Sequence, residues 1–171
     1  KIFQAAGLPD GVINFLPGSG GQVGTPAMNS EWLARIHFTG SNDVFNGMWE
    51  TVASNVRKYR TYPRMVGETG GKDFAFVHES ADLESTIAAI IRGAFEYQGQ
   101  KCSATSRAYI PESLWPEIKD RLLSEISSIK MGDVEDFTNF MSAVIDQAAF
   151  NSIKAYIDYA RNSSEARIIY G

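Results

Sequence analysis

The sequence predicts an α/β protein with a mostly parallel sheet. Short apolar runs with strand character alternate along the chain with longer amphipathic segments whose apolar residues follow helical spacing. Glycine-containing turns follow several of the apolar runs and lead into such a helix. Strands that alternate with helices favour parallel sheets. The 44% hydrophobic and 12% aromatic content of these 171 residues suits a packed core rather than disorder.

The first part of the chain predicts two strands and two helical segments. Residues 1–6 look like the last turn of a helix that a glycine and a proline then stop. Residues 12–16 form an apolar run between a glycine and a proline, which predicts a buried strand. Residues 35–39 predict another strand. The helix after it has an apolar face made of Phe45, Met48, Trp49, Val52 and Val56.

The second part predicts further strands and three helices. Residues 73–77 form a strand, and Asp82 is expected to cap the helix that leads toward Cys102. Residues 107–110 predict a strand that a proline stops. Two amphipathic helices follow, one over residues 114–126 and one that carries Phe150, Ile153 and Ile157, and residues 167–171 look like a final strand.

A glycine-rich stretch at residues 67–71 interrupts this pattern and predicts a boundary between residues 1–70 and 71–171. The chain shows neither an initiator methionine nor a signal peptide, so we expect it to be an internal part of a longer protein. No apolar run approaches the roughly 20 residues of a membrane helix. We therefore expect no membrane partner.

Charge and cysteine usage exclude several classes of function. A formal charge of −4 argues against nucleic acid as the main partner. One cysteine cannot form an internal disulfide, which favours a reducing compartment. The two histidines, His37 and His78, lie far apart without cysteine spacing between them, so we expect no metal site and structural roles for both.

The most informative pair of residues is Glu68, in a glycine-flanked turn, and Cys102, the single cysteine. A thiol can attack a carbonyl carbon, and a carboxylate can then activate the water that releases the product. The alternatives are a small buried cysteine and a solvated turn glutamate. The polar residues 98–101 before Cys102 are unlike a core segment and favour the chemical interpretation.

Two glycine-containing segments are candidates for a phosphate or nucleotide site. Residues 18–24 resemble a dinucleotide fingerprint, although the third glycine comes one position late, and a tight strand–helix turn is the alternative. Residues 38–41 end a strand and open a helix at Gly40 and Ser41, where unpaired backbone amides suit a pyrophosphate. The alternative for Ser41 is a helix cap alone.

Four segments, VINFLPGSG, FTGS, ETGGK and GQKCSA, occur in an order and at a spacing that resemble the aldehyde dehydrogenase superfamily. Residues 76–82, 95–104, 113–116 and 142–146 resemble its Δ1-pyrroline-5-carboxylate dehydrogenase branch in particular. The resemblance implies an aldehyde dehydrogenase-like fold. Residues 1–70 would then be the C-terminal half of an NAD-binding domain, and residues 71–171 the N-terminal part of an α/β catalytic domain.

The same resemblance implies a role for each matching residue. Cys102 is the nucleophile that forms a thioester, and Glu68 is the general base for its hydrolysis. Ser103 contacts the substrate carboxylate, with a local backbone-bonding serine as the alternative. The residues expected to bind NAD are Gly18, Gly40, Ser41, Asn42, Asp43 and Val44.

The resemblance further implies oxidation of L-glutamate γ-semialdehyde to glutamate in proline catabolism, in the mitochondrial matrix, by a homodimer. We expect the isolated 171 residues to be inactive, because other parts of the site lie outside them. Three alternatives remain: another aldehyde dehydrogenase of different substrate choice, a cysteine hydrolase or acyltransferase that needs a histidine near Cys102, and a non-enzymatic cofactor-binding module.

Overall fold

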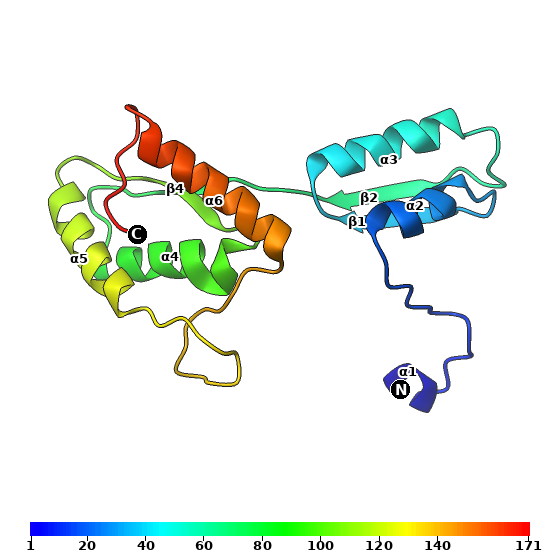
Figure 1. Cartoon of the computed structure of the whole chain (residues 1–171), viewed down its shortest axis with the longest axis horizontal. Coiled ribbons are helices and arrows are strands. Elements are labelled where there is room, and N and C mark those ends of the chain that lie inside the picture. The colour runs from blue at the N-terminus through cyan, green and yellow to red at the C-terminus, as the bar shows by residue number, and fades with distance from the viewer. The chain divides into compact units, whose positions relative to one another are not determined.

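The computed structural model describes residues 1–171 and divides into two units, Lys1–Gly70 and Gly71–Gly171. Figure 1 labels most of the elements along the chain. Each unit contains a pair of parallel strands with helices, so the predicted α/β class is confirmed. What the two parts do, one binding NAD and one belonging to a catalytic domain, stays a prediction.

The first unit is built on two parallel strands, with Arg35 opposite Arg64 at one end and Thr39 opposite Glu68 at the other. Both strands therefore end at the same edge. The elements of this unit are α1 (Ile2–Ala5), α2 (Gly20–Asn29), β1 (Arg35–Thr39), α3 (Asn42–Ser54) and β2 (Arg64–Glu68).

Helix α3 packs on this strand pair through an aromatic side chain and a glycine. The rings of Phe38 on β1 and Phe45 on α3 stack with centroids 5.8 Å apart. A Cβ added at Gly67 on β2 would overlap the Phe45 ring. Glycine is therefore needed at position 67 because it leaves room for the helix.

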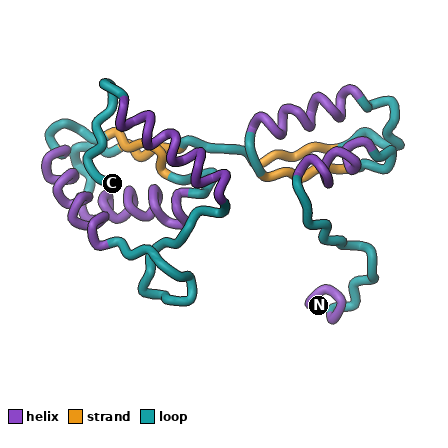
Figure 2. Tube along the Cα trace, in the orientation of Figure 1, coloured by secondary structure: helices purple, strands orange, loops and turns teal.

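The second unit also has two parallel strands, in which Asp73 pairs with Thr105 and Phe76 with Tyr109. Figure 2 shows the residues between its last two helices as loop, apart from an isolated bridge between Met131 and Met141. The elements are β3 (Asp73–Phe76), α4 (Leu83–Phe95), the 3₁₀ segment η1 (Glu96–Gly99), β4 (Thr105–Tyr109), α5 (Trp115–Ser128) and α6 (Gln147–Asn162).

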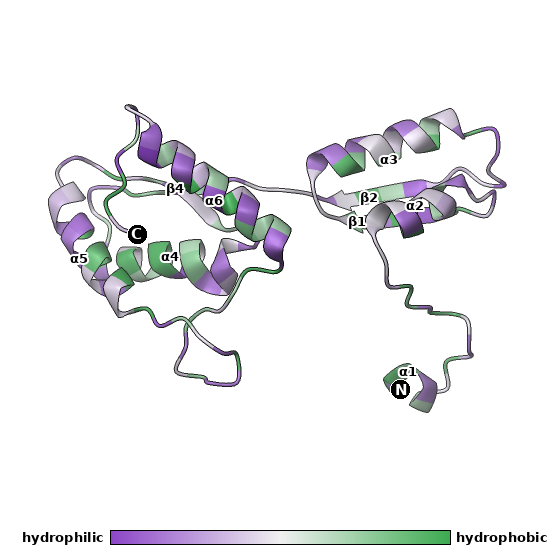
Figure 3. Cartoon of the chain, viewed as in Figure 1, coloured by the Kyte–Doolittle hydropathy of each residue, from purple (hydrophilic) through white to green (hydrophobic).

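The core of the second unit lies around α4, much of which is coloured as hydrophobic in Figure 3. Ile118 of α5 is 0% exposed and packs with Val77, Ile87 and Ile90. Helical spacing places Ile87 and Ile90 on one face of α4. This core fixes the helix whose end leads, through η1, to Cys102.

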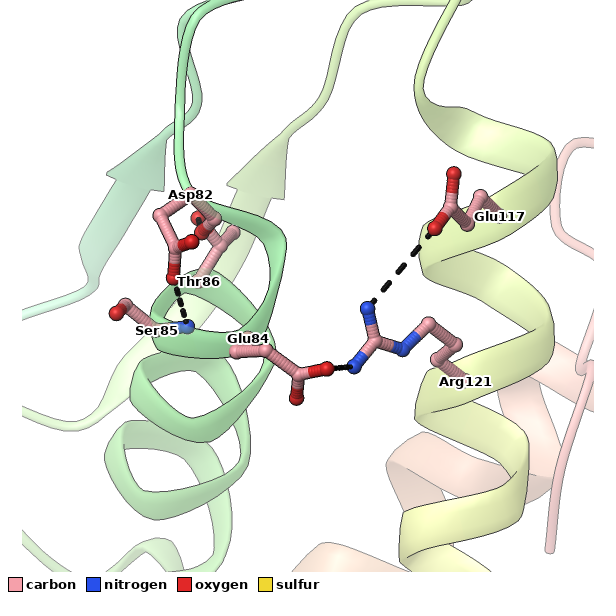
Figure 4. A network of polar contacts seen from close by, with 6 residues as sticks. All are labelled: Asp82, Glu84, Ser85, Thr86, Glu117 and Arg121. Carbon is pink, nitrogen blue, oxygen red and sulfur yellow. Dashed lines mark hydrogen bonds and ion pairs between the residues drawn. The ribbon is translucent and has the colours of Figure 1, made fainter.

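The start of α4 is capped as the sequence predicts. The Ser85 amide donates to Asp82 Oδ1 at 2.8 Å, and the Thr86 hydroxyl donates to the Asp82 carbonyl at 2.7 Å. Arg121 of α5 forms an ion pair with Glu84 on α4 (Figure 4). The cap and the ion pair together fix the entry of α4 against α5.

Two predicted strands are absent and one strand was not foreseen. Residues 12–16 form no strand, and Phe15 is 89% exposed. Residues 167–171 likewise form no strand. A strand needs a neighbour for its ladder of hydrogen bonds, and within this chain β1–β2 and β3–β4 pair only with each other. Conversely, Glu68 ends strand β2, whereas the sequence predicted a turn there.

The remaining predicted elements are confirmed within a few residues of their expected bounds. They are the short helix at the start, strands β1, β3 and β4, and helices α3, α4, α5 and α6. No helix in the structure combines the length and the apolar character that crossing a membrane requires.

Candidate active site

Cys102 lies at the tip of a tight turn in the second unit. The Ala104 amide donates to the Lys101 carbonyl at 3.1 Å, which makes Cys102 and Ser103 the two central residues of a β-turn. Ala104 is buried and anchors the turn at the start of β4, whereas Cys102 is exposed with a free thiol. The alternative of a small buried cysteine is therefore wrong for this structure.

Gly71 packs against the backbone of this turn. A Cβ added at Gly71 would overlap the carbonyl oxygen of Cys102 and lie 2.9 Å from its carbonyl carbon. The next residue, Lys72, has a φ of 116°, which is unfavourable for a residue with a side chain. Its carbonyl accepts a hydrogen bond from Arg107 Nη2 at 2.7 Å, which helps to hold this conformation against β4.

The polar groups around Cys102 differ in whether they are already paired. Lys101 forms an ion pair with Glu96, with 3.3 Å between Nζ and Oε2. Ser103 is exposed, and its hydroxyl makes no hydrogen bond within the chain. The alternative of a local backbone-bonding serine therefore has no support here, and the Ser103 hydroxyl is available to a ligand.

The segment before Cys102 holds two features that the sequence did not reveal. Tyr97, Gln98 and Gly99 have φ angles of 55°, 57° and 67°, which makes three successive left-handed residues. The amide of Ile145 donates to Gln100 Oε1 at 2.9 Å across 45 positions of sequence. Residues 96–100 and 132–145 also line a pocket of about 610 Å³, which neither Cys102 nor Ser103 lines.

In the first unit, Glu68 lies beside the other candidate segment, residues 38–41. Thr39 and Glu68 are opposite each other at the carboxyl ends of β1 and β2, and the Gly40 amide donates to the Glu68 carbonyl at 3.1 Å. In open parallel sheets, ligands bind outside the carboxyl ends of the strands. Two segments that were singled out separately in the sequence thus meet at one edge.

The N-terminus of α3 offers fewer free amides than the sequence suggested. The amide of Gly40 is used by Glu68, and that of Val44 donates to Ser41 Oγ at 3.3 Å. The amides of Asn42 and Asp43 in the first helical turn have no partner within the chain. Ser41 is therefore a helix cap, and its hydroxyl proton is still available for a second hydrogen bond.

Gly18 lies just before α2, where Ser19 caps the helix by accepting from the Gln22 amide at 3.4 Å. A Cβ at Gly18 would come within 2.9 Å of Val23 Cγ2. The close packing of this turn against Val23 is a sufficient reason for a glycine at position 18, without any contact to a ligand. A contact of Gly18 with a cofactor stays a prediction.

Neither histidine belongs to a group of side chains arranged to hold a metal. His78 Nδ1 lies 2.9 Å from the Ser80 hydroxyl and accepts from the Ser80 amide at 3.2 Å. His37 is on β1, in the first unit. No group of three or more His, Cys, Asp or Glu side chains has the arrangement of a metal site.

Comparison with known proteins gives consistent matches over the chain. Residues 1–171 match the model of the aldehyde dehydrogenase family. The mitochondrial delta-1-pyrroline-5-carboxylate dehydrogenase of Dictyostelium discoideum is 56% identical over 173 residues, and the match covers 100% of this chain and 31% of that protein. The protein of the same name from Mus musculus is 51% identical over 172 residues, with the same coverage.

A solved structure is similar as well. The crystal structure of the delta-pyrroline-5-carboxylate dehydrogenase from Mycobacterium tuberculosis bound with NAD has a TM-score of 0.91 and 47% identity. The match covers 95% of this chain and 30% of that one. The chain thus spans about a third of the length of the relatives that it matches.

Proposed function

This chain belongs to the aldehyde dehydrogenase family, and from that premise we propose that it is part of an NAD-dependent dehydrogenase that oxidises L-glutamate γ-semialdehyde to glutamate. Its fold is the aldehyde dehydrogenase-like α/β fold that the sequence predicted. The observation that carries the proposal is Cys102, the single thiol of the chain, exposed at the tip of a tight turn. The longer protein to which these residues would belong is called the parent protein below.

Cys102 and Glu68 divide the chemistry in this proposal. The Cys102 thiolate attacks the aldehyde carbon, and the tetrahedral oxyanion accepts hydrogen bonds from nearby donors. Loss of a hydride from that carbon leaves a thioester on Cys102. Glu68 takes a proton from water, the hydroxide adds to the thioester carbonyl, and the C–S bond breaks to release glutamate and the thiolate.

The first turn of α3 is the part of the chain that fits a bound dinucleotide. The amides of Asn42 and Asp43 are unpaired and lie at the positive end of the helix dipole, which favours a pyrophosphate. Ser41 keeps a hydroxyl proton to donate. When bound, NAD supplies the acceptor for the hydride. The Mycobacterium relative was solved with NAD, which supports this choice of cofactor.

The choice of substrate rests on the names of the relatives and on Ser103. Several relatives are delta-1-pyrroline-5-carboxylate dehydrogenases, which supports a role in proline catabolism. The unpaired Ser103 hydroxyl, next to the nucleophile, is suited to donate to the substrate carboxylate. The mitochondrial names of the relatives support a mitochondrial site of action, and we propose that this is the matrix. We propose in addition that the parent protein is a homodimer.

The test is NADH formation by the parent protein with glutamate γ-semialdehyde, measured beside a Cys102→Ser variant. The proposal expects NADH from the wild type and none above background from Cys102→Ser. NADH from simple aliphatic aldehydes but not from the semialdehyde would keep the enzyme class and reject the substrate. No NADH with any aldehyde, from a folded protein that binds NAD, would reject the proposal.

A further inference from the structure

The segment that leads to Cys102 contains a strained turn. Tyr97 and Gln98 lie in the left-handed region, at φ 55° and 57°, and Gly99 follows at φ 67°. Left-handed residues other than glycine occur mainly where surrounding contacts hold them, and each costs about 1–3 kcal/mol. Two such residues in a row, the second of them four positions before Cys102, therefore require a restraint.

Gln100 provides contacts that suit this restraint. Its Nε2 donates to the Tyr97 carbonyl at 3.3 Å and lies 3.3 Å from Gln98 Oε1. Its Oε1 accepts from the Ile145 amide at 2.9 Å. One half-buried side chain thus closes the left-handed turn and joins it to a segment 45 positions away.

The turn is also closed by a backbone bond from the Gln100 amide to the Tyr97 carbonyl at 3.1 Å, but that bond does not join it to another segment. The nearby ion pairs are weaker restraints. The ion pair between Lys101 and Glu96 and the one between Arg92 and Glu96 are solvent-exposed, and exposed pairs contribute about 0–1 kcal/mol. Residues 96–100 and 132–145 line the same pocket, so the space between them is not filled by packed side chains. The bond from Ile145 to Gln100 spans these two segments.

We propose that Gln100 is a positioning residue for Cys102. By closing the turn at Tyr97 and holding it to Ile145, Gln100 fixes the backbone two residues before the nucleophile and so presents the thiol in one orientation. The inference rests on the proposed function, since it concerns the same thiol. A displacement of about 1 Å at a reacting group can cost about 100-fold in rate, so loss of this restraint should slow chemistry rather than substrate binding.

Two variants of Gln100 distinguish the role of its Nε2 donor from that of its Oε1 acceptor. Gln100→Met keeps the length of the side chain and removes all three hydrogen bonds, whereas Gln100→Glu keeps only the oxygen that accepts from Ile145. Gln147→Met is the matched control, because Gln147 is exposed and bonds only to Asn151 within α6, at 2.8 Å.

The first readout is the rate constant of NADH formation in a single turnover of the parent protein at saturating substrate. We expect Gln100→Met to lower this rate constant by about 10- to 100-fold with KM changed by less than about threefold. Gln100→Glu should also lower the rate constant, because a carboxylate oxygen then replaces the donor that faces the Tyr97 carbonyl and Gln98 Oε1, whereas Gln147→Met should match the wild type. A variant that is merely less stable would lose NADH amplitude and keep the rate constant.

The second readout does not depend on activity. Hydrogen exchange at the Ile145 amide should be faster in Gln100→Met than in the wild type and unchanged in Gln147→Met. Wild-type rate constants in Gln100→Met, or unchanged exchange at the Ile145 amide in that variant, would each overturn the inference. If the wild type forms no NADH, the proposed function fails. If the wild type is active and Gln100→Met equals it, only the inference fails.

Discussion

Gly71 lies directly against the carbonyl oxygen of Cys102, so closely that a Cβ at position 71 would overlap that oxygen. The φ angle of Gly71 is not in the left-handed region, so space and not backbone conformation requires the glycine. The obstructing atom is backbone, which cannot swing away as a side chain can. Gly71 thus supports the nucleophile turn from the side of β3.

Gly71→Ala should therefore displace the turn that carries Cys102. We expect kcat of the parent protein to fall by about 10- to 100-fold, because the sulfur moves relative to the bound aldehyde. The measurement is steady-state NADH formation, together with the rate of Cys102 alkylation by iodoacetamide.

Gly70→Ala is the control for that variant. No atom lies within 4 Å of a Cβ added at Gly70, so the substitution should leave kcat within about twofold of wild type. Equal activities of Gly71→Ala and Gly70→Ala would show that the close contact at Gly71 does not position the nucleophile.

A second pair of glycines tests how α3 packs. Gly67→Ala places a methyl group into the Phe45 ring and should destabilise α3 by about 1–3 kcal/mol. Gly47→Ala, inside α3 with no atom near the added Cβ, should instead stabilise the helix by about 1 kcal/mol. Native-state hydrogen exchange of the α3 amides measures both, and a change of the same sign in both variants would contradict this packing.

Shortening the Ile118 side chain in the core of the second unit should lower the free energy of unfolding in proportion to the atoms removed. Ile118→Val should cost about 0.5–1.5 kcal/mol and Ile118→Ala about 2–5 kcal/mol, because the side chain is fully buried against Val77, Ile87 and Ile90. Urea denaturation followed at α4 or α5 measures the loss. A cost for Ile118→Ala no larger than that for Ile118→Val would mean that the site does not pack as described.

The cap of α4 predicts a pH dependence. The hydrogen bond from the Ser85 amide, and then that from its hydroxyl, hold the pKa of Asp82 below its ordinary value of about 3.9. A lowered pKa contributes stability that is present above the unfolded-state pKa and is lost as pH falls through the folded-state pKa.

Asp82→Ala should therefore lower the melting temperature by a constant amount near neutral pH, and the difference should shrink below about pH 4. The comparison is thermal unfolding of both proteins across that range. Asp82→Asn keeps an oxygen acceptor without titrating and serves as the control. A difference that grows as pH falls would contradict the role of the ionised cap.

Local patterns predicted most of the helices but not every strand. The apolar spacing of α4 and the cap at Asp82 are properties of a few neighbouring residues, and the structure confirms both. Residues 12–16 have strand composition, but a strand also needs a partner, and none pairs with them in this chain. The strand at Arg64–Glu68 was missed because its glycine and the following glycines indicate a turn.

In the candidate site, too, features of neighbouring residues could be predicted, whereas features that depend on distant contacts could not. Cys102, Ser103 and Ser41 could be singled out because their chemistry and flanking residues are visible in sequence. The left-handed turn at Tyr97 and the bond from Ile145 to Gln100 could not, since they depend on contacts across 45 positions. A signal for Gly71 was present in the Gly70-Gly71 pair, although only the structure tells which of the two has a neighbour.

Rapid mixing of the parent protein with NAD and glutamate γ-semialdehyde, followed by mass spectrometry of the quenched protein, tests the separate roles of Cys102 and Glu68. We expect Glu68→Gln to form about one NADH per site and then stall, with a glutamyl group on Cys102, because the thioester forms but is not hydrolysed. Cys102→Ser should form no NADH. Continuous turnover by Glu68→Gln at the wild-type rate would contradict the role of Glu68 as general base, and NADH from Cys102→Ser would contradict the role of Cys102 as nucleophile.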